Sequence, residues 1–189
     1  MESSLRGYGA TTQFALVSYI PEPLGSFLSD LRTELVPHCR LQSHVTLLTP
    51  RPLASPTWAL IDELRRETAR LDSFEVELCQ LEIFPVTNVI YLSIGKGRNE
   101  IVRMHDTLAR EMFDYQEPFP FHPHITLAQE IPEDAINDVF TRACARWEAW
   151  DRPRTFPVDE LVFVRNVNMR GWEDLSSHPL KPAHTLQPR

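Results

Sequence analysis

Two short segments of the sequence pair an imidazole with a hydroxyl at the same spacing. His44 and Thr46 flank a valine, and His124 and Thr126 flank an isoleucine. Side chains alternate between the two faces of a β-strand, so the histidine and the threonine of each segment are expected to share one face. Residues two apart on a strand lie about 6.5 Å apart, and two such groups can both reach one phosphate.

Cleavage of a phosphodiester needs a base to activate the nucleophile and an acid to protonate the leaving oxygen. Histidine suits both roles, because its ordinary pKa of about 6.5 is close to a working pH near neutrality. The threonine hydroxyls would donate to the non-bridging oxygens, where negative charge builds up. This scheme requires no metal and no cofactor. One His-x-Thr segment alone carries little meaning, but two at matching places in similar halves predict a shared phosphate site.

The order of predicted elements recurs along the chain, as strand, helix, His-x-Thr strand, helix and strand. The first half covers residues 12–84 and the second covers 88–175, with only a turn between them. We therefore predict one α+β domain over 12–175 with two pseudo-symmetric lobes, and loose termini at 1–11 and 176–189. The expected strands are 14–20, 45–49, 74–83, 89–94, 124–128, 158–167 and 171–175, and the expected helices are 24–35, 55–71, 101–112 and 132–147.

Composition limits the class of partner. Apolar residues make up 42% and charged residues 24% of the chain, which is typical of a soluble globular protein. The net charge of −7 disfavours a long duplex, because basic contacts to phosphates dominate non-specific nucleic-acid binding. No apolar run reaches the length of a membrane helix, and the N-terminus lacks signal-peptide features. We expect a cytoplasmic protein, without membrane attachment, that binds a small nucleotide or a short RNA end. The sequence favours a monomer but leaves the oligomeric state open.

The repeated motif resembles that of the 2H phosphoesterase superfamily, and most closely its branch related to bacterial 2′-5′ RNA ligase, also called RNA 2′,3′-cyclic phosphodiesterase. The phrases SHVTLL at 43–48 and FHPHITL at 121–127 carry this resemblance, together with Phe84-Pro85 before a strand that starts near residue 88. It covers roughly residues 12–175. It implies two α+β lobes around a central cleft, each with an antiparallel sheet that carries one motif and with helices outside.

The resemblance also implies roles for individual residues. His44 and His124 would act as base and acid, in an order that the sequence leaves open, and Thr46 and Thr126 would hold the phosphate. The substrate would be a 2′,3′-cyclic phosphate or a 2′-5′ linkage on a nucleotide or RNA end, with ligation as the reverse reaction. Further residues that could contact the substrate are Arg51, Tyr91, Phe121, His122, Gln129 and Arg165.

One position departs from the pattern of this branch. Members that act on RNA ends often carry an arginine two residues after the last hydrophobic residue of the second motif, where this chain has Gln129. Arg51 or Arg165 could replace that cation. The departure bears on the exact substrate more than on the reaction class. It is also the best support for an alternative function, in which the cleft binds a nucleotide or an RNA end without turnover. A non-nucleotide phosphodiester is a further alternative.

A metal site is the remaining alternative. His122 and His124 stand close together in the sequence, but Pro123 separates them and no third ligand stands nearby. Zinc needs three or four protein ligands. We therefore expect no metal, and we expect two catalytic imidazoles to give a bell-shaped pH–rate profile with limbs on either side of neutrality.

Overall fold

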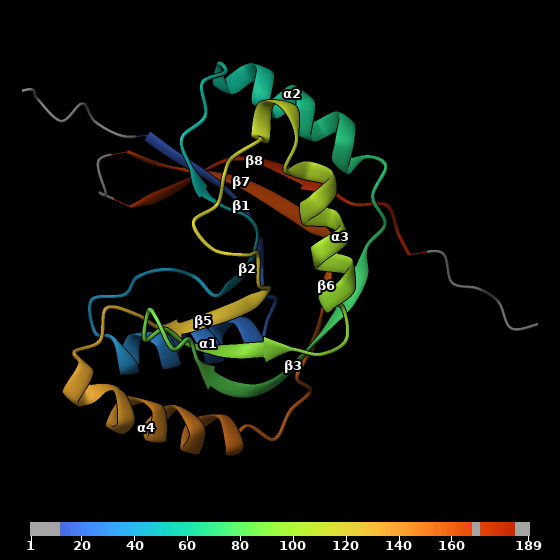
Figure 1. The fold of residues 1–189 in the computed structure, drawn as a ribbon. Helices are drawn as coiled ribbons and strands as arrows, with labels where there is room; N and C mark the ends of the chain where they lie inside the picture. Colours follow the sequence, from blue (N-terminus) through green and yellow to red (C-terminus); the bar gives the residue numbers. More distant parts are fainter. Residues whose placement is uncertain (1–11, 168–170, 184–189) are drawn as a thin grey trace, which may run out of the picture.

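The computed structural model describes residues 12–167 and 171–183, which fold into eight strands and four α-helices (Figure 1). The predicted strands and helices are all present, with boundaries that differ by a few residues. A short strand at 155–158 was not predicted, because its proline hides the alternating pattern. The elements are β1 (Thr12–Tyr19), α1 (Leu24–Leu35), β2 (His44–Arg51), α2 (Thr57–Thr68), β3 (Phe74–Ile83), β4 (Ile90–Ile94), α3 (Arg98–Leu108), β5 (His124–Ala128), α4 (Ile136–Glu148), β6 (Thr155–Val158), β7 (Glu160–Val167) and β8 (Trp172–Pro179), with short 3-10 turns at Glu111–Phe113 and Glu133–Ala135.

Two four-stranded sheets make up the framework. Their strand orders are β2-β1-β7-β8 and β5-β4-β3-β6, and the paired strands run antiparallel throughout. The orders correspond strand by strand, since the two motif strands β2 and β5 occupy one edge of their sheets and pair with β1 and β4. The predicted α+β fold with two pseudo-symmetric antiparallel sheets is confirmed.

The lobes are not the sequential halves 12–84 and 88–175 that the sequence suggested. β3 comes from the first half but pairs with β4 of the second, and β7 returns from the second half to pair with β1. The reason lies in the connection after β3, where residues 84–89 form a short hairpin loop. A loop this short joins strands that are antiparallel neighbours in one sheet. Each sheet therefore contains strands from both halves.

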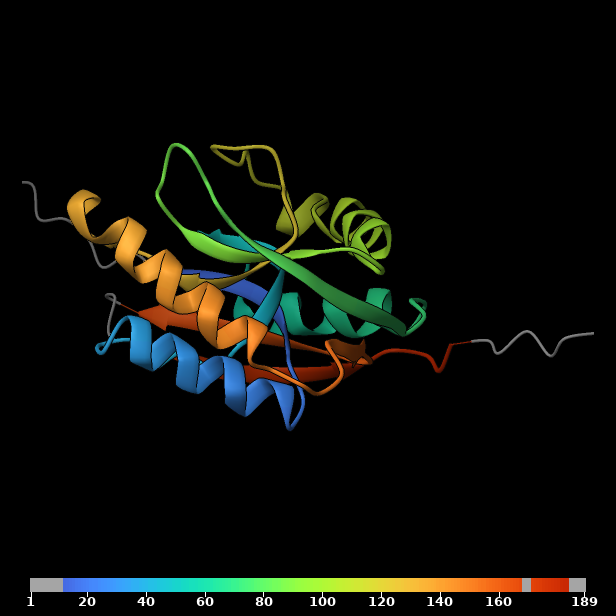
Figure 2. The ribbon, with the colours of Figure 1, turned by 90° about the horizontal axis from the view of Figure 1, so that it is seen from below.

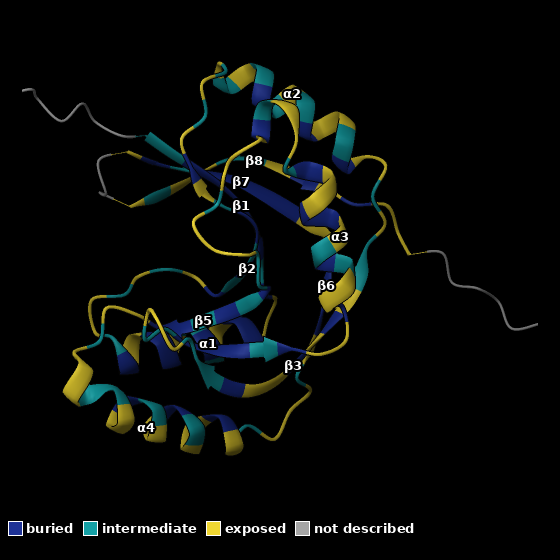
Figure 3. Ribbon diagram, viewed as in Figure 1, coloured by how far each residue is buried: buried dark blue, intermediate teal, exposed yellow. Residues whose placement is uncertain are grey.

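Each sheet is likewise covered by one helix from the first half of the chain and one from the second (Figures 1 and 2). α1 and α4 pack together against the sheet of β5, whereas α2 and α3 pack against the sheet of β2. Apolar residues at helical spacing turn inward, and Figure 3 shows buried faces toward the sheets and exposed faces outside. The main core joins both sheets, with Leu16, Leu47, Leu92 and Ile125 fully buried, and a small second cluster lies on β1 and β7. None of the helices in the described ranges is long and apolar enough to cross a membrane.

The C-terminal segment corrects one prediction. Residues 176–183 were expected to be loose, but β8 continues to Pro179 and the side chain of Leu180 is buried. The backbone of Lys181 then donates to the carbonyl of Leu71 at 2.9 Å and accepts from the amide of Ser73 at 2.7 Å. Polar residues dominate this strand, so its sequence resembles a tail. Residues 1–11 and 184–189, also expected to be loose, lie outside the described residues.

Candidate active site

The two motif strands meet where the two sheets adjoin. β2 and β5 are edge strands of different sheets, and Cα atoms of one lie within 8 Å of Cα atoms of the other (Figure 1). The apolar residues of each motif point into the core, where Val45, Leu47, Ile125 and Leu127 are buried. The histidines and threonines alternate with them and are half-buried on the opposite face. Packing of the apolar face thus turns both imidazole–hydroxyl pairs toward one seam.

Both imidazoles are held in the same way. Nδ1 of His44 lies 2.7 Å from the carbonyl oxygen of Gln42, and Nδ1 of His124 lies 2.7 Å from that of His122. A carbonyl oxygen can only accept a hydrogen bond, so Nδ1 carries a proton in each ring. In a neutral ring this leaves Nε2 unprotonated and free to take a proton. The backbone therefore fixes the tautomer that an acid or base at Nε2 requires.

A tyrosine on the neighbouring strand stands beside each motif histidine, although Tyr91 is the register partner of Thr126 and not of His124. Tyr19 pairs with His44 across β1 and β2, and their rings meet edge-on with centroids 6.4 Å apart. Tyr91 of β4 stands 5.4 Å from His124, at an angle of 70°. Both tyrosine hydroxyls donate to carboxylates, at 2.7 Å to Asp174 and 2.8 Å to Glu82. These carboxylates fix the orientation of the rings that flank the imidazoles. Tyr19 was not predicted, because its place opposite His44 depends on the pairing of β1 with β2.

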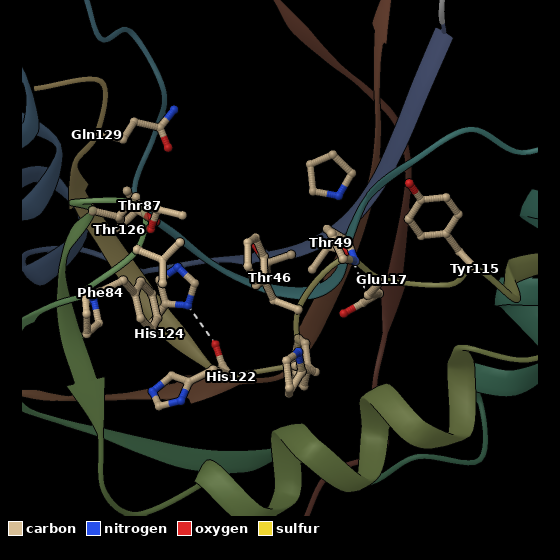
Figure 4. Close-up of a pocket in the computed structure, with 18 residues that line it drawn as sticks. Thr46, Thr49, Phe84, Thr87, Tyr115, Glu117, His122, His124, Thr126 and Gln129 are labelled. Carbon is tan, nitrogen blue, oxygen red and sulfur yellow. Dashed lines mark hydrogen bonds between the residues drawn. The ribbon is translucent and has the colours of Figure 1, made fainter.

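A cavity of about 590 Å³ opens beside the motifs (Figure 4). Figure 4 shows His124, Thr126 and Gln129 at one end, Tyr115 and Glu117 at the other, and Thr46 between them. His44 does not line this cavity, although it shares a strand face with Thr46. The lining residues are Thr46, Thr49, Pro50, Phe84, Pro85, Val86, Thr87, Val89, Tyr115, Glu117, Pro118, Phe119, Pro120, Phe121, His122, His124, Thr126 and Gln129.

Burial and nearby positive charge lower the pKa of both motif histidines. The pKa of His44 is lowered to about 4, mainly by burial and also by the charges of Arg32 and His124, against the opposing effect of the Gln42 carbonyl. Burial also lowers the pKa of His124, with smaller contributions from the charges of His122 and Arg32, while the bond to the His122 carbonyl raises it. The effect of His124 on the pKa of His44 places the two rings within electrostatic reach of each other.

Arg32 is a buried cation at the seam that the sequence analysis missed. Its side chain is only 2% exposed and donates to the carbonyl oxygen of Thr126, and to Sγ of Cys39 at 3.4 Å. Its Nε has no hydrogen-bond partner among the described residues. The signal was available, because Arg32 follows Leu28 by one helical turn and so falls on the apolar stripe of α1. A charge there is rare unless it is paired or functional.

Three of the predicted substrate-contacting residues line the cavity. These are Phe121, His122 and Gln129, which all come from the segment around β5. Phe121 stacks on His105 with ring centroids 3.7 Å apart, so one face of its ring is already covered. Nδ1 of His105 in turn lies 2.7 Å from the carbonyl oxygen of Leu47. The wall that Phe121 forms is therefore tied to the first motif strand.

Arg51 does not line the cavity, contrary to the prediction. Two register shifts in the pairing of β1 with β2 place Arg51 opposite Phe14, whose ring lies in the core. Cross-strand partners share a face, so the guanidinium points inward and is 1% exposed. Its Nη2 lies 2.5 Å from Oε1 of Glu117, and its Nη1 donates to the carbonyl oxygen of Phe113 at 2.9 Å. Arg51 thus anchors the cavity wall from behind.

Arg165 and Tyr91 also fall outside the cavity lining. Arg165 forms an ion pair with Glu173 on the neighbouring strand β8, so its charge is committed there. Tyr91 is buried beneath Phe84, with ring centroids 4.0 Å apart, and it supports that residue from below. In the described part of the chain, no group of three or more His, Cys, Asp or Glu side chains could hold a metal ion.

This arrangement, with equivalent His-x-Thr strands on two pseudo-symmetric sheets, defines the class of 2H phosphoesterases. The chain belongs to the 2′-5′ RNA ligase superfamily, whose family model matches residues 20–170. The resemblance expected from the motifs is thereby confirmed.

Relatives in sequence carry a similar description. A protein of Oceanobacillus iheyensis named "Putative phosphoesterase" is 31% identical over 83 residues, which cover 43% of this chain and 48% of that protein. One of Halalkalibacterium halodurans with the same description is 26% identical over 128 residues, or 66% of this chain and 74% of that one. Family and relatives together support an activity of the phosphoesterase type.

Solved structures share the fold at low sequence identity. E. coli LigT complexed with 3′-AMP matches with a TM-score of 0.60 and 16% identity, over 90% of this chain and 99% of that one. A protein of Thermus thermophilus matches with a TM-score of 0.58 and 19% identity, over 91% of this chain and 100% of that one. These likenesses bear on the fold of the chain.

Proposed function

We propose that this protein is a metal-independent phosphodiesterase that acts on a 2′,3′-cyclic phosphate or a 2′-5′ linkage of a nucleotide or RNA end. The observation that carries the proposal is the meeting of two edge strands, one from each sheet. They bring two equivalent imidazole–hydroxyl pairs to one seam beside a cavity. Two titratable groups and two hydroxyl donors are what hydrolysis of a phosphodiester requires.

The proposed reaction uses Nε2 of both rings. The neutral imidazole takes a proton from water as the water oxygen attacks phosphorus, and a new P–O bond forms. The bond from phosphorus to one ribose oxygen breaks, and the protonated imidazole gives its proton to that oxygen. The hydroxyls of Thr46 and Thr126 donate to the non-bridging oxygens. His44 and His124 supply the two rings, and either order of roles satisfies this scheme.

Structures of a fold relative support a nucleotide as the substrate. E. coli LigT has been solved in complex with 3′-AMP, with ATP and with NADP+. In this chain the cavity beside Thr126 is large enough for a nucleoside and is bordered by aromatic rings that could pack on a base. We therefore extend to this cavity, as part of the proposal, the binding of a nucleoside with a single phosphate, as in 3′-AMP.

The pH dependence of kcat/KM is expected to lie on the acidic side of neutrality. The pH profile of kcat/KM reports the pKa values of the acid and the base in the free enzyme. Activity should fall at low pH as the base is protonated, and on the alkaline side as the acid loses its proton. The pKa of His44 is lowered to about 4 and that of His124 is also lowered, so both limbs should lie below the ordinary histidine value of about 6.5. This revises the expectation of limbs on either side of neutrality.

The measurement is kcat/KM for a 2′,3′-cyclic nucleotide between about pH 4 and pH 8. Arg32→Met removes one positive charge that lowers both pKa values, so both limbs should move to higher pH. Arg32→Lys keeps the charge and serves as the matched control, with limbs closer to those of the unmodified protein. An alkaline limb at or above the ordinary histidine pKa in the unmodified protein would contradict the account, as would identical profiles for Arg32→Met and the unmodified protein.

Removal of divalent metal ions is expected to leave turnover unchanged. The proposed acid, base and phosphate contacts are all protein side chains, so a chelator has no component to extract. The test is the rate of hydrolysis after dialysis against EDTA, with and without added zinc. A loss of activity that zinc restores would point to a metal-dependent mechanism instead.

A further inference from the structure

Most of the cavity wall beyond the motif residues is apolar. It comes from the β3–β4 hairpin loop and from the segment that precedes β5. Val86 in the first is 80% exposed and Phe119 in the second is 56% exposed, so large apolar groups stand at the rim in contact with solvent. Exposed apolar residues that border a concave site are typical of a surface that receives an apolar or aromatic ligand group.

The second feature of the cavity is the charge of its described lining. None of the described residues that line it is a lysine or an arginine. Its one carboxylate, Glu117, is already paired with Arg51 behind the wall. Among the lining residues that the structure describes, only His122 and His124 can become cationic, and burial lowers the pKa of each.

Arg32 supplies charge only from within the core. It donates to the backbone of Thr126, on the strand that carries the second motif, and its side chain is almost fully buried. The site can therefore compensate one phosphate near the motifs. Arg98 is exposed and close enough for its charge to lower the pKa of His122, but it does not line the cavity. A second phosphate held against the lining would therefore lose water without gaining a fixed charged partner there, which is costly.

We propose that the cavity selects phosphodiesters whose remaining substituent is a neutral aromatic group, and discriminates against those that carry a second phosphate. The preferred substrate class is thus a nucleoside 2′,3′-cyclic phosphate with a free 5′-hydroxyl, rather than a 5′-phosphorylated nucleotide or the end of an oligonucleotide. This inference rests on the proposed phosphodiesterase function and specifies its substrate.

A matched pair of substrates tests the selectivity. Adenosine 2′,3′-cyclic phosphate and the same compound with a 5′-phosphate differ only in the second charged group. We expect kcat/KM to be higher for the 5′-hydroxyl compound by on the order of tenfold. Equal values, or a preference for the 5′-phosphate, would overturn the inference and leave the phosphodiesterase proposal intact. Turnover of neither compound would overturn the phosphodiesterase proposal and the inference with it.

A positive charge placed at the rim tests whether the discrimination against a second phosphate is caused by the lack of a cation in the lining. Val86→Lys adds a cation where the side chain is largely exposed, so it should fold normally and reduce the discrimination severalfold. This reduction in discrimination should disappear at high salt, because exposed charges are screened. Trp58→Lys is the matched control, since Trp58 is 71% exposed on α2 and does not line the cavity. An equal reduction in discrimination in both variants, or no reduction in Val86→Lys, would contradict the inference.

Removal of an aromatic wall residue tests whether the cavity selects substrates with an aromatic substituent. Phe119→Ala should lower kcat/KM for adenosine 2′,3′-cyclic phosphate by about tenfold, within the range for loss of a base–aromatic contact. It should leave turnover of glycerol 1,2-cyclic phosphate, which has no base, nearly unchanged. An equal loss for both compounds would show that Phe119 does not act through the aromatic substituent.

Discussion

His124→Ala and His44→Ala are each expected to lose at least about 100-fold in kcat on a 2′,3′-cyclic nucleotide, the loss typical of a missing general acid or base. In the proposed reaction each ring moves one proton through Nε2, and alanine has no group that can replace it. The double variant should be little worse than either single variant, because residues that act as a unit are strongly non-additive. Initial rates under saturating substrate provide the measurement.

The control for this loss is His38→Ala. His38 is exposed in the turn after α1 and lies outside the cavity, so its removal should leave the rate unchanged. Circular dichroism and thermal unfolding must show that all variants fold, because His44 and His124 also bond to backbone carbonyls. Folded variants with nearly normal turnover would remove the paired-histidine mechanism.

Glu117→Ala is expected to destabilise the protein by about 3 kcal/mol, because it leaves the guanidinium of Arg51 buried without a counter-charge. The pair spans the wall, with Arg51 on β2 and Glu117 in the segment that also carries Phe119 and Phe121. The Thr49 hydroxyl donates to the same carboxylate at 2.9 Å and would lose that partner too. Urea unfolding measures the change in free energy, and KM should rise as the wall loosens.

A matched ion pair elsewhere provides the comparison. Glu173→Ala breaks the pair with Arg165 on the outer strands, where Glu173 is more than half exposed. Exposed pairs contribute roughly 0–1 kcal/mol, so this variant should unfold almost like the unmodified protein. If Glu117→Ala and Glu173→Ala cost the same small amount, the wall is not anchored by the buried pair.

Local patterns in the sequence predicted the elements well. The alternation of Phe74, Val76 and Leu78 with glutamates gave the bounds of β3, and leucines at helical spacing gave those of α1. The same periodicity placed His44 and Thr46 on one face of a strand. These features depend on which side of an element is apolar, and that information is contained in a few neighbouring residues.

The pairing of strands that are distant in the sequence could not be predicted from local patterns. Periodicity states which face of β3 or β7 is buried but not which strand lies beside it, so the exchange of strands between lobes was missed. Arg51 followed the first motif closely, yet register shifts in β2 turned it into the core. Arg32 was missed for a different reason. An arginine on the apolar stripe of α1 indicates a buried charge, and this indication was not used.

The central claim is that both imidazoles act on one phosphate, and product formation tests it most directly. Purified protein is incubated with adenosine 2′,3′-cyclic phosphate in EDTA across the acidic and neutral range, and phosphorus NMR follows the substrate. The account predicts that the cyclic phosphodiester signal gives way to a phosphomonoester signal, fastest below the ordinary histidine pKa. Saturable binding of the nucleotide with no product at any pH would contradict it, and would leave a nucleotide-binding protein with this fold.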